Sequence, residues 1–181
     1  MFSDFLRFAR KIDKFNILVG GSVALLNVLL VLNVFAIVVL RYFFGENLIW
    51  QSEISEFISS LIFLTAAGYT YFYNNHVKVD ILFEKFSEYT KAYINIIGII
   101  TLLIPMVLGI SYFSWGYVAS SWAIFESSGE PGGMYGVFLF KSLIFLFCSS
   151  LFLQSLSVLI KSISKVRKFD WLWIIILRTN I

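Results

Sequence analysis

The chain has 181 residues, of which 59% are hydrophobic and only 14% are charged, and its mean hydropathy is +0.85. A soluble domain carries about 25% charged residues because water must wet its surface, so this composition excludes an ordinary soluble domain. The single Cys148 excludes an intramolecular disulfide and a cysteine-cluster metal site, and the single His76 excludes an intrachain bis-histidine haem. The net charge of +3 is no nucleic-acid signature, because the basic residues gather at the ends of apolar runs.

Four uncharged runs predict four transmembrane helices. Spanning a bilayer as a helix takes about 20 mostly apolar residues. Runs without a charge cover residues 15–40, 57–75, 92–125 and 142–160. We therefore expect an all-α integral membrane protein, whose membrane domain covers residues 16–164 with spans at about residues 16–40, 50–73, 94–119 and 134–160.

Segments outside these spans also show helical or basic patterns. Residues 1–15 repeat apolar residues at helical spacing among basic ones, which favours an interfacial amphipathic helix over a disordered basic terminus. A similar pattern over residues 81–93 predicts a second interfacial helix between spans two and three. Pro105 lies in the middle of the third run, where it is expected to kink the helix. Residues 165–181 form a basic and aromatic tail, whose apolar run is too short to span.

The basic residues predict the orientation in the membrane. Cytoplasmic loops carry an excess of lysine and arginine. The N-terminal segment, the second loop and the C-terminal tail hold 12 of the 14 lysines and arginines, whereas the first loop holds only Arg41 and the third loop none. Both termini are therefore expected on the cytoplasmic side.

Charged residues also lie where spans are expected: Arg41, Glu53, Glu56 and Lys141. Ionisable groups inside a bilayer normally pair or face a protein interface. We therefore predict ion pairs of Glu56 with Lys141 and of Glu53 with Arg41, or one network of all four. Alternatively, Glu53 complements a helix N-terminus and Arg41 snorkels to the surface. A further alternative is that Trp50, Glu53 and Glu56 face a partner subunit.

Uncharged polar and small residues within the spans predict contacts between helices. Amide and hydroxyl side chains can hydrogen-bond across helices, and glycine and alanine permit close approach. The residues concerned are Asn27, Asn33, Thr65, Thr70 and Gln154, together with Gly20, Gly21, Ala66, Ala67, Gly68 and Gly109. Cys148 is expected to pack as a small apolar residue.

Several motifs, in order, resemble the small membrane subunit of tripartite ATP-independent periplasmic (TRAP) transporters. The first block consists of Arg41-Tyr42, Trp50 with Glu53, Gly68, and the second-loop segment from His76 to Asp80. The second block consists of the third loop, residues 126–133, followed by Lys141 and Gln154. The resemblance covers about residues 16–164.

The chain departs from the family pattern at three places. Trp50-Gln-Ser-Glu53 stands where the family commonly has Trp-Ser-Glu-Glu. Glu56 occupies a position where the family pattern has a basic or neutral residue. The span after Lys141 lacks the Pro-x-Gly motif of the family pattern. These departures concern the individual contacts that the family pattern implies, and not the resemblance to the family as a whole.

The resemblance implies a non-catalytic subunit that works in the bacterial inner membrane. Such a subunit is a scaffold for a large permease subunit, which carries the substrate and sodium sites and moves as an elevator. No cofactor is expected in this chain. A periplasmic solute-binding protein is the third component, and the third loop, with Glu126, Glu130 and Pro131, is a possible docking surface for it. Membrane lipid is the remaining expected partner.

Two other classes of function fit the sequence less well. A self-contained four-helix carrier or channel should show a continuous polar stripe through at least one span, and here the polarity of the spans stops in their outer half. A membrane enzyme needs a convergent catalytic group. His76 and Cys148 are expected on different levels of the membrane, so they form no such group.

Overall fold

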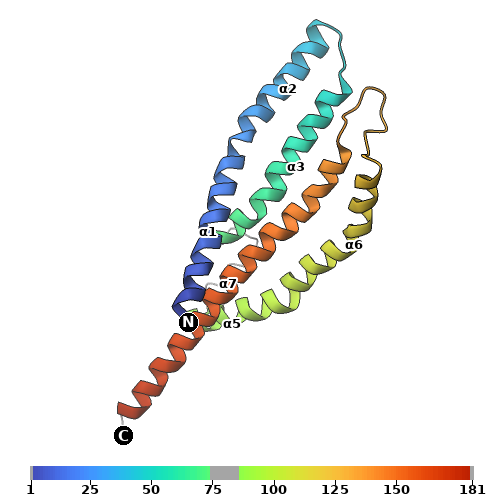
Figure 1. Ribbon diagram of the computed structural model, residues 1–181. Coiled ribbons are helices and arrows are strands. Elements are labelled where there is room, and N and C mark those ends of the chain that lie inside the picture. Colours follow the sequence, from blue (N-terminus) through green and yellow to red (C-terminus); the bar gives the residue numbers. More distant parts are fainter. Residues whose placement is uncertain (1, 74–85, 180–181) are drawn as a thin grey trace.

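The computed structural model describes residues 2–73 and 86–179, and the side chains of residues 4–73 and 86–168 (Figure 1). His76 and Asp80, and most of the expected second interfacial helix, lie outside these residues. The described parts are helical, and their only β-type contact is an isolated bridge between Ser127 and Tyr135. The elements are α1 (Phe2–Ala24), α2 (Leu26–Phe43), α3 (Ile49–Phe72), α5 (Glu88–Gly98), the π-helical segment η1 (Ile99–Leu103), α6 (Ile104–Ala123) and α7 (Val137–Thr179).

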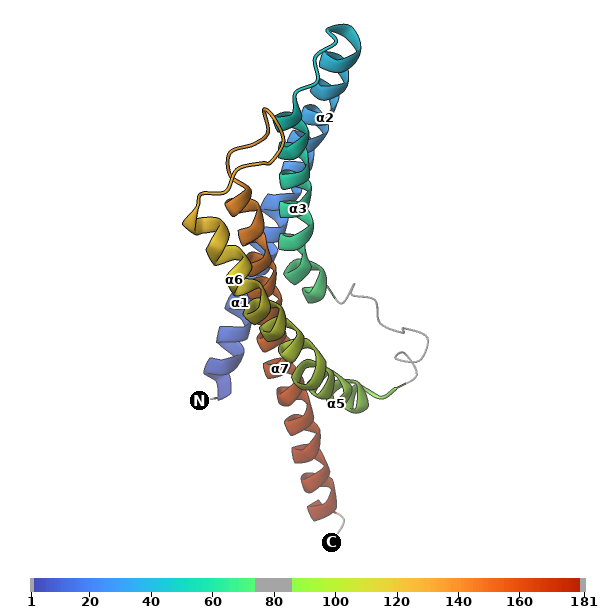
Figure 2. The ribbon, with the colours of Figure 1, turned by 90° about the vertical axis from the view of Figure 1, so that its right-hand side faces the viewer.

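Helix α7 is the centre of the bundle. It packs against α1, α3, α5 and α6, whereas α2 packs chiefly against α3 (Figures 1 and 2). The core is built from Val107, Cys148 and Leu151, and Ala67 and Tyr71 of α3 pack against it. The expectation that Cys148 packs as a small apolar residue is confirmed, since its exposed fraction is 3%.

In the part of the chain that the structure describes, three helices are long and apolar enough to cross a membrane. They cover Asp4–Phe43, Glu88–Ala123 and Val137–Lys168. Helix α3 has 24 residues, which at 1.5 Å per residue gives a length of about 36 Å. Its first half carries two glutamates and several serines, which lower its apolar character. The all-helical membrane architecture is therefore confirmed, while the count of four spans and the orientation of the termini stay predictions.

The expected N-terminal amphipathic segment is helical and continues into the first span without a boundary at residue 15. Helix α1 runs to Ala24, and a single turn at Leu25 separates it from α2. Ala9 and Ile12 are buried in the bundle. One face of this segment therefore packs inside the protein, because a small residue at position 9 lets α1 approach its neighbours closely.

The third span bends where proline was expected to disturb it. Segments α5, η1 and α6 form one curved helix (Figure 1). Pro105 has no N–H to donate and clashes with the preceding turn. The π-helical segment stands directly before it, and the Ile104 N–H donates to the Ile99 carbonyl. The wider turn accommodates the proline and produces the bend.

Helix α7 continues far beyond the expected fourth span. Its 43 residues correspond to a length of about 65 Å, whereas a hydrocarbon core is about 30 Å thick. The helix includes the tail expected at residues 165–181 up to Thr179, and its last turns extend past the other helices in both views (Figures 1 and 2).

Candidate functional site

Polar side chains gather at both ends of the bundle. The first group, here named the loop cluster, lies around the loop between α6 and α7. It consists of the side chains of Glu53, Glu126, Ser128 and Lys141 and the backbone N–H of Met134. The second group, here named the α1–α7 cluster, consists of Asp13, Asn16, Gln154, Ser157 and Lys161. Both contain a carboxylate, a lysine and a serine.

In the loop cluster, Glu53 fastens the loop to the start of α3. Its carboxylate accepts a hydrogen bond from the Ser128 hydroxyl and a second, at 2.5 Å, from the Met134 backbone N–H. A Cβ atom at Gly133 would lie 2.5 Å from Ser128 and 2.9 Å from Glu53. Only glycine therefore lets the loop approach the carboxylate this closely.

Lys141 forms the second half of the loop cluster. Its ammonium donates to Glu126 at 2.5 Å and lies 4.1 Å from the centre of the Tyr117 ring. The hydrogen bond from Lys141 lowers the pKa of the Glu126 carboxyl below its ordinary value. The pair ties the end of α6 to the first turns of α7.

This arrangement differs from the expected ion pairs. Lys141 pairs with Glu126 and not with Glu56, and Glu53 binds hydroxyl and backbone groups and not Arg41. Glu56 and Arg41 are exposed and have no ion pair within the described parts of the chain. The physical reason is proximity, because α6 and α7 are consecutive neighbours and Glu126 directly follows the end of α6.

The remaining residues expected at an interface are exposed. Trp50 has an exposed fraction of 43%, and Glu130 and Pro131 lie exposed at the tip of the loop. A role of these residues, and of Glu53 and Glu56, in contacting a partner stays a prediction.

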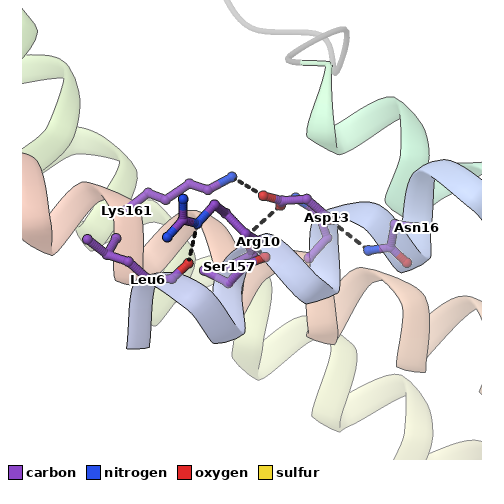
Figure 3. A network of polar contacts seen from close by, with 8 residues as sticks. Leu6, Arg10, Asp13, Asn16, Ser157 and Lys161 are labelled. Carbon is purple, nitrogen blue, oxygen red and sulfur yellow. Dashed lines mark hydrogen bonds and ion pairs between the residues drawn. The ribbon is translucent and has the colours of Figure 1, made fainter. Parts of the chain in front are cut away.

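The α1–α7 cluster is centred on Asp13 (Figure 3). One carboxylate oxygen accepts from the Ser157 hydroxyl at 2.6 Å and from the Gln154 amide at 3.1 Å, and the other accepts from the Lys161 ammonium. Asn16 donates to Gln154 at 2.7 Å. Gln154 and Ser157 are fully buried, and Asp13 is 6% exposed. A carboxylate with several donors and a lysine can be buried at tolerable cost, so this cluster locks α1 onto α7.

Our sequence reasoning missed Asp13, because it stands in a segment rich in charges that was expected at the membrane surface. A usable signal exists in the spacing. Ala9, Asp13, Asn16 and Gly20 repeat at helical spacing along one face of α1. This stripe of small and polar residues predicts a close, hydrogen-bonded helix contact.

Two of the polar residues expected to join helices do so. Asn33 of α2 donates to the Gln51 carbonyl at 3.0 Å and to the Ser55 hydroxyl at 2.8 Å, and Gln154 joins α7 to α1. Asn27 and Thr70 instead donate to carbonyls of their own helices. The Thr65 hydroxyl is buried and has no hydrogen-bond partner among the described residues.

The expected close approach is confirmed at two of the glycines. A Cβ atom at Gly20 would lie 2.5 Å from the Tyr69 ring, and one at Gly68 would lie 3.0 Å from the Ser150 carbonyl oxygen. At Gly21 and Gly109 it would meet nothing within 4 Å, so no helix of the described chain approaches closely there. The close contacts therefore join α3 to α1 and to α7.

These clusters stabilise contacts between helices, and they offer no obvious metal site. Over residues 4–73 and 86–168, no group of three or more histidine, cysteine, aspartate or glutamate side chains could hold a metal ion. Each lysine in the two clusters is bound to a carboxylate of this chain.

Comparison with known protein families matches residues 30–165, well over half of the chain, to the tripartite ATP-independent periplasmic transporters, DctQ component. The matched segment contains the whole loop cluster and the α7 half of the α1–α7 cluster, while Asp13 and Asn16 precede it. Comparisons with curated proteins and with solved structures gave no match. The chain therefore belongs to the DctQ family, the small permease component of TRAP transporters.

Proposed function

We propose that this chain is the non-catalytic small subunit of a sodium-coupled importer of organic anions in the bacterial inner membrane. In this proposal it scaffolds a large elevator-type subunit that holds the substrate and sodium sites. Family membership supports the role of small permease component. The coupling ion, the class of substrate and the scaffolding contacts go beyond that membership.

The exposed apolar surface of α2 is the observation that carries the scaffolding role. None of the residues of α2 is buried by the described parts of the chain. Large apolar side chains of this helix are exposed on several sides, among them Val28, Val31, Leu32 and Phe35. One side of α2 meets α3, which leaves a long apolar surface for another membrane helix. Since hydrocarbon solvates such a surface too, close packing is what a partner helix would add.

The internal polar contacts favour a scaffold over a self-contained carrier. A carrier must expose polar groups to its solute and release them during each cycle. Here the carboxylates of Asp13, Glu53 and Glu126 are engaged by hydroxyl, backbone or lysine donors of the same chain. Such satisfied contacts hold helices in one arrangement, as a fixed support requires.

The loop between α6 and α7 is the proposed docking surface for the solute-binding protein. With both termini cytoplasmic, this loop faces the periplasm. Glu130 and Pro131 are exposed at its tip, and Tyr135 is 92% exposed. The hydrogen bonds to Glu53 hold the loop in one shape, which reduces the entropy lost on binding.

The first test of this function is purification of the tagged chain from its native membrane in mild detergent, followed by mass spectrometry. We expect a stoichiometric, larger multi-span partner. Liposomes that contain both chains should take up solute with the binding protein and sodium, and liposomes with this chain alone should not. Solute uptake by this chain alone would contradict the proposal in favour of the self-contained carrier.

Two variant sets test the proposed surfaces. A photo-crosslinking residue at Phe35 should capture the partner, while one at Phe113, an exposed phenylalanine of α6, serves as the matched control. Glu130→Lys should lower uptake without changing complex assembly. Glu130 is the better choice than Glu126, because reversal at Glu126 also breaks its ion pair with Lys141. Unchanged uptake in Glu130→Lys would count against the docking role.

A further inference from the structure

We propose that the cavity between α5 and α7 binds the phosphate group of an anionic phospholipid. The cavity has a volume of about 170 Å³, whereas the share of one water in the liquid is about 30 Å³, so it admits a group several times the size of water. Its lining includes the charged residues Glu88, Lys91, Lys161 and Lys165, together with Phe72 and Asn95.

Positive charge dominates the lining of this cavity. Three ammonium groups line it, and the carboxylates that bind them are Glu88, on the wall, and Asp13, behind Lys161. Each ammonium carries three donors. Lys91 and Lys165 share the single carboxylate of Glu88, at 3.2 and 3.1 Å, so both retain donors for a further acceptor. A phosphate has the charge and the oxygens to fill this deficit of acceptors.

Asn95 adds an uncharged donor to the same wall. Its side-chain amide makes no hydrogen bond with any residue that the structure describes. It lies one turn from Lys91 on the face of α5 that is turned toward the cavity. The cavity is thus lined by amide and ammonium donors from two helices, α5 and α7.

The position of the cavity favours a lipid over a free phosphate ion. Lys161 and Lys165 stand at the end of the apolar part of α7, where a membrane helix meets the headgroups. Next to the cavity, Ile94 and Ile97 of α5 are 39% and 58% exposed and can contact an acyl chain. Basic pockets between helices at this level are typical headgroup sites. A lipid brings its phosphate there without the full loss of hydration that a free ion suffers.

Glu88 is expected to compete with the lipid for the lysines. Its side chain and that of Lys165 are each 58% exposed, and exposed ion pairs contribute little stability. A phosphate can therefore take over one or both lysines. Removing the Glu88 carboxylate should strengthen lipid binding, which is the opposite of what loss of a structural ion pair would do to the site.

The test is lipid binding by the full-length protein in detergent, followed by native mass spectrometry. The probes are phosphatidylglycerol, phosphatidylcholine and inorganic phosphate. We expect preference for phosphatidylglycerol, a loss of affinity of roughly fivefold for each of Lys91→Gln and Lys165→Gln, and a gain in Glu88→Gln. Lys14→Gln removes an exposed lysine of α1 outside the cavity and should change nothing.

Three results would overturn the proposal. The first is equal loss in Lys14→Gln and in the two cavity variants, which would indicate only a general charge effect. The second is weaker lipid binding in Glu88→Gln. The third is displacement of phosphatidylglycerol by inorganic phosphate at comparable concentration, which would make the soluble ion the ligand. Lipid binding requires no transport, so the inference stands or falls separately from the proposed function.

Discussion

The two polar clusters use the same groups in different settings. In the α1–α7 cluster the donors to Asp13 come from consecutive turns of one regular helix, and the carboxylate is 6% exposed. In the loop cluster the donors come partly from the backbone and a hydroxyl of a loop, and the side chains of Glu126 and Lys141 are 31% and 13% exposed. Helices enclose a carboxylate because their side chains repeat on one face, whereas a loop wraps a carboxylate without burying it fully.

This difference predicts different costs when each cluster is broken. Loss of the charge on Asp13 weakens its hydrogen bonds with two fully buried donors, Ser157 and Gln154, which is expensive. Loss of the charge on Glu126, whose side chain is 31% exposed, lets water replace the missing group. Three predictions follow the order of expected effect.

The largest effect is expected for Asp13→Asn. The substitution weakens the hydrogen bonds from the buried Ser157 and Gln154 and removes the charge that Lys161 binds, so the free energy of unfolding should fall by about 2 kcal/mol. The measurement is the thermal unfolding midpoint of the purified chain in detergent. Asp4→Asn is the matched control in the same helix, because the side chain of Asp4 is 66% exposed and the change should cost less than about 0.5 kcal/mol. Equal shifts for both variants would show that the enclosure of Asp13 contributes nothing.

An intermediate and local effect is expected for Glu53→Gln. The neutral amide accepts more weakly from the Ser128 hydroxyl and the Met134 N–H, so the loop should open more often. Hydrogen–deuterium exchange at the Met134 amide should become several-fold faster, while amides within α7 next to Gln154 should not change. Glu56→Gln is the control, since Glu56 is an exposed glutamate one turn further along α3. Faster exchange in the control as well would contradict the assigned role of Glu53.

The smallest effect is expected from pH at the Glu126–Lys141 pair. Lys141 lowers the pKa of Glu126 below its ordinary value of 4.5, so the pair contributes fully above that value. Its contribution is lost as the pH falls through the lowered pKa. Wild type should therefore be more stable than Glu126→Gln at pH 7, and the difference in unfolding midpoint should vanish in strong acid. A difference that persists undiminished in strong acid would rule out the ion pair as its source.

Sequence reasoning located the charges of the loop cluster but not their partners. Lys141, Glu53 and Glu56 interrupt apolar runs, and that signal is visible in a sequence. Their partners depend on how the loop folds back over α3, which Gly133 permits through its lack of a side chain. Asp13 was missed because its neighbours along the chain are charged and exposed, and only its neighbours on the helix face are buried.

The sequence by itself determined that this is a helical membrane protein, because long uncharged runs have no other stable place. It also determined the bend near Pro105 and the family, because both depend on residue types at fixed positions. Only the tertiary structure decided which carboxylate meets which lysine, and that the N-terminal segment packs onto α7. Such contacts join residues far apart in the chain, and their geometry is set by helix packing and not by local spacing.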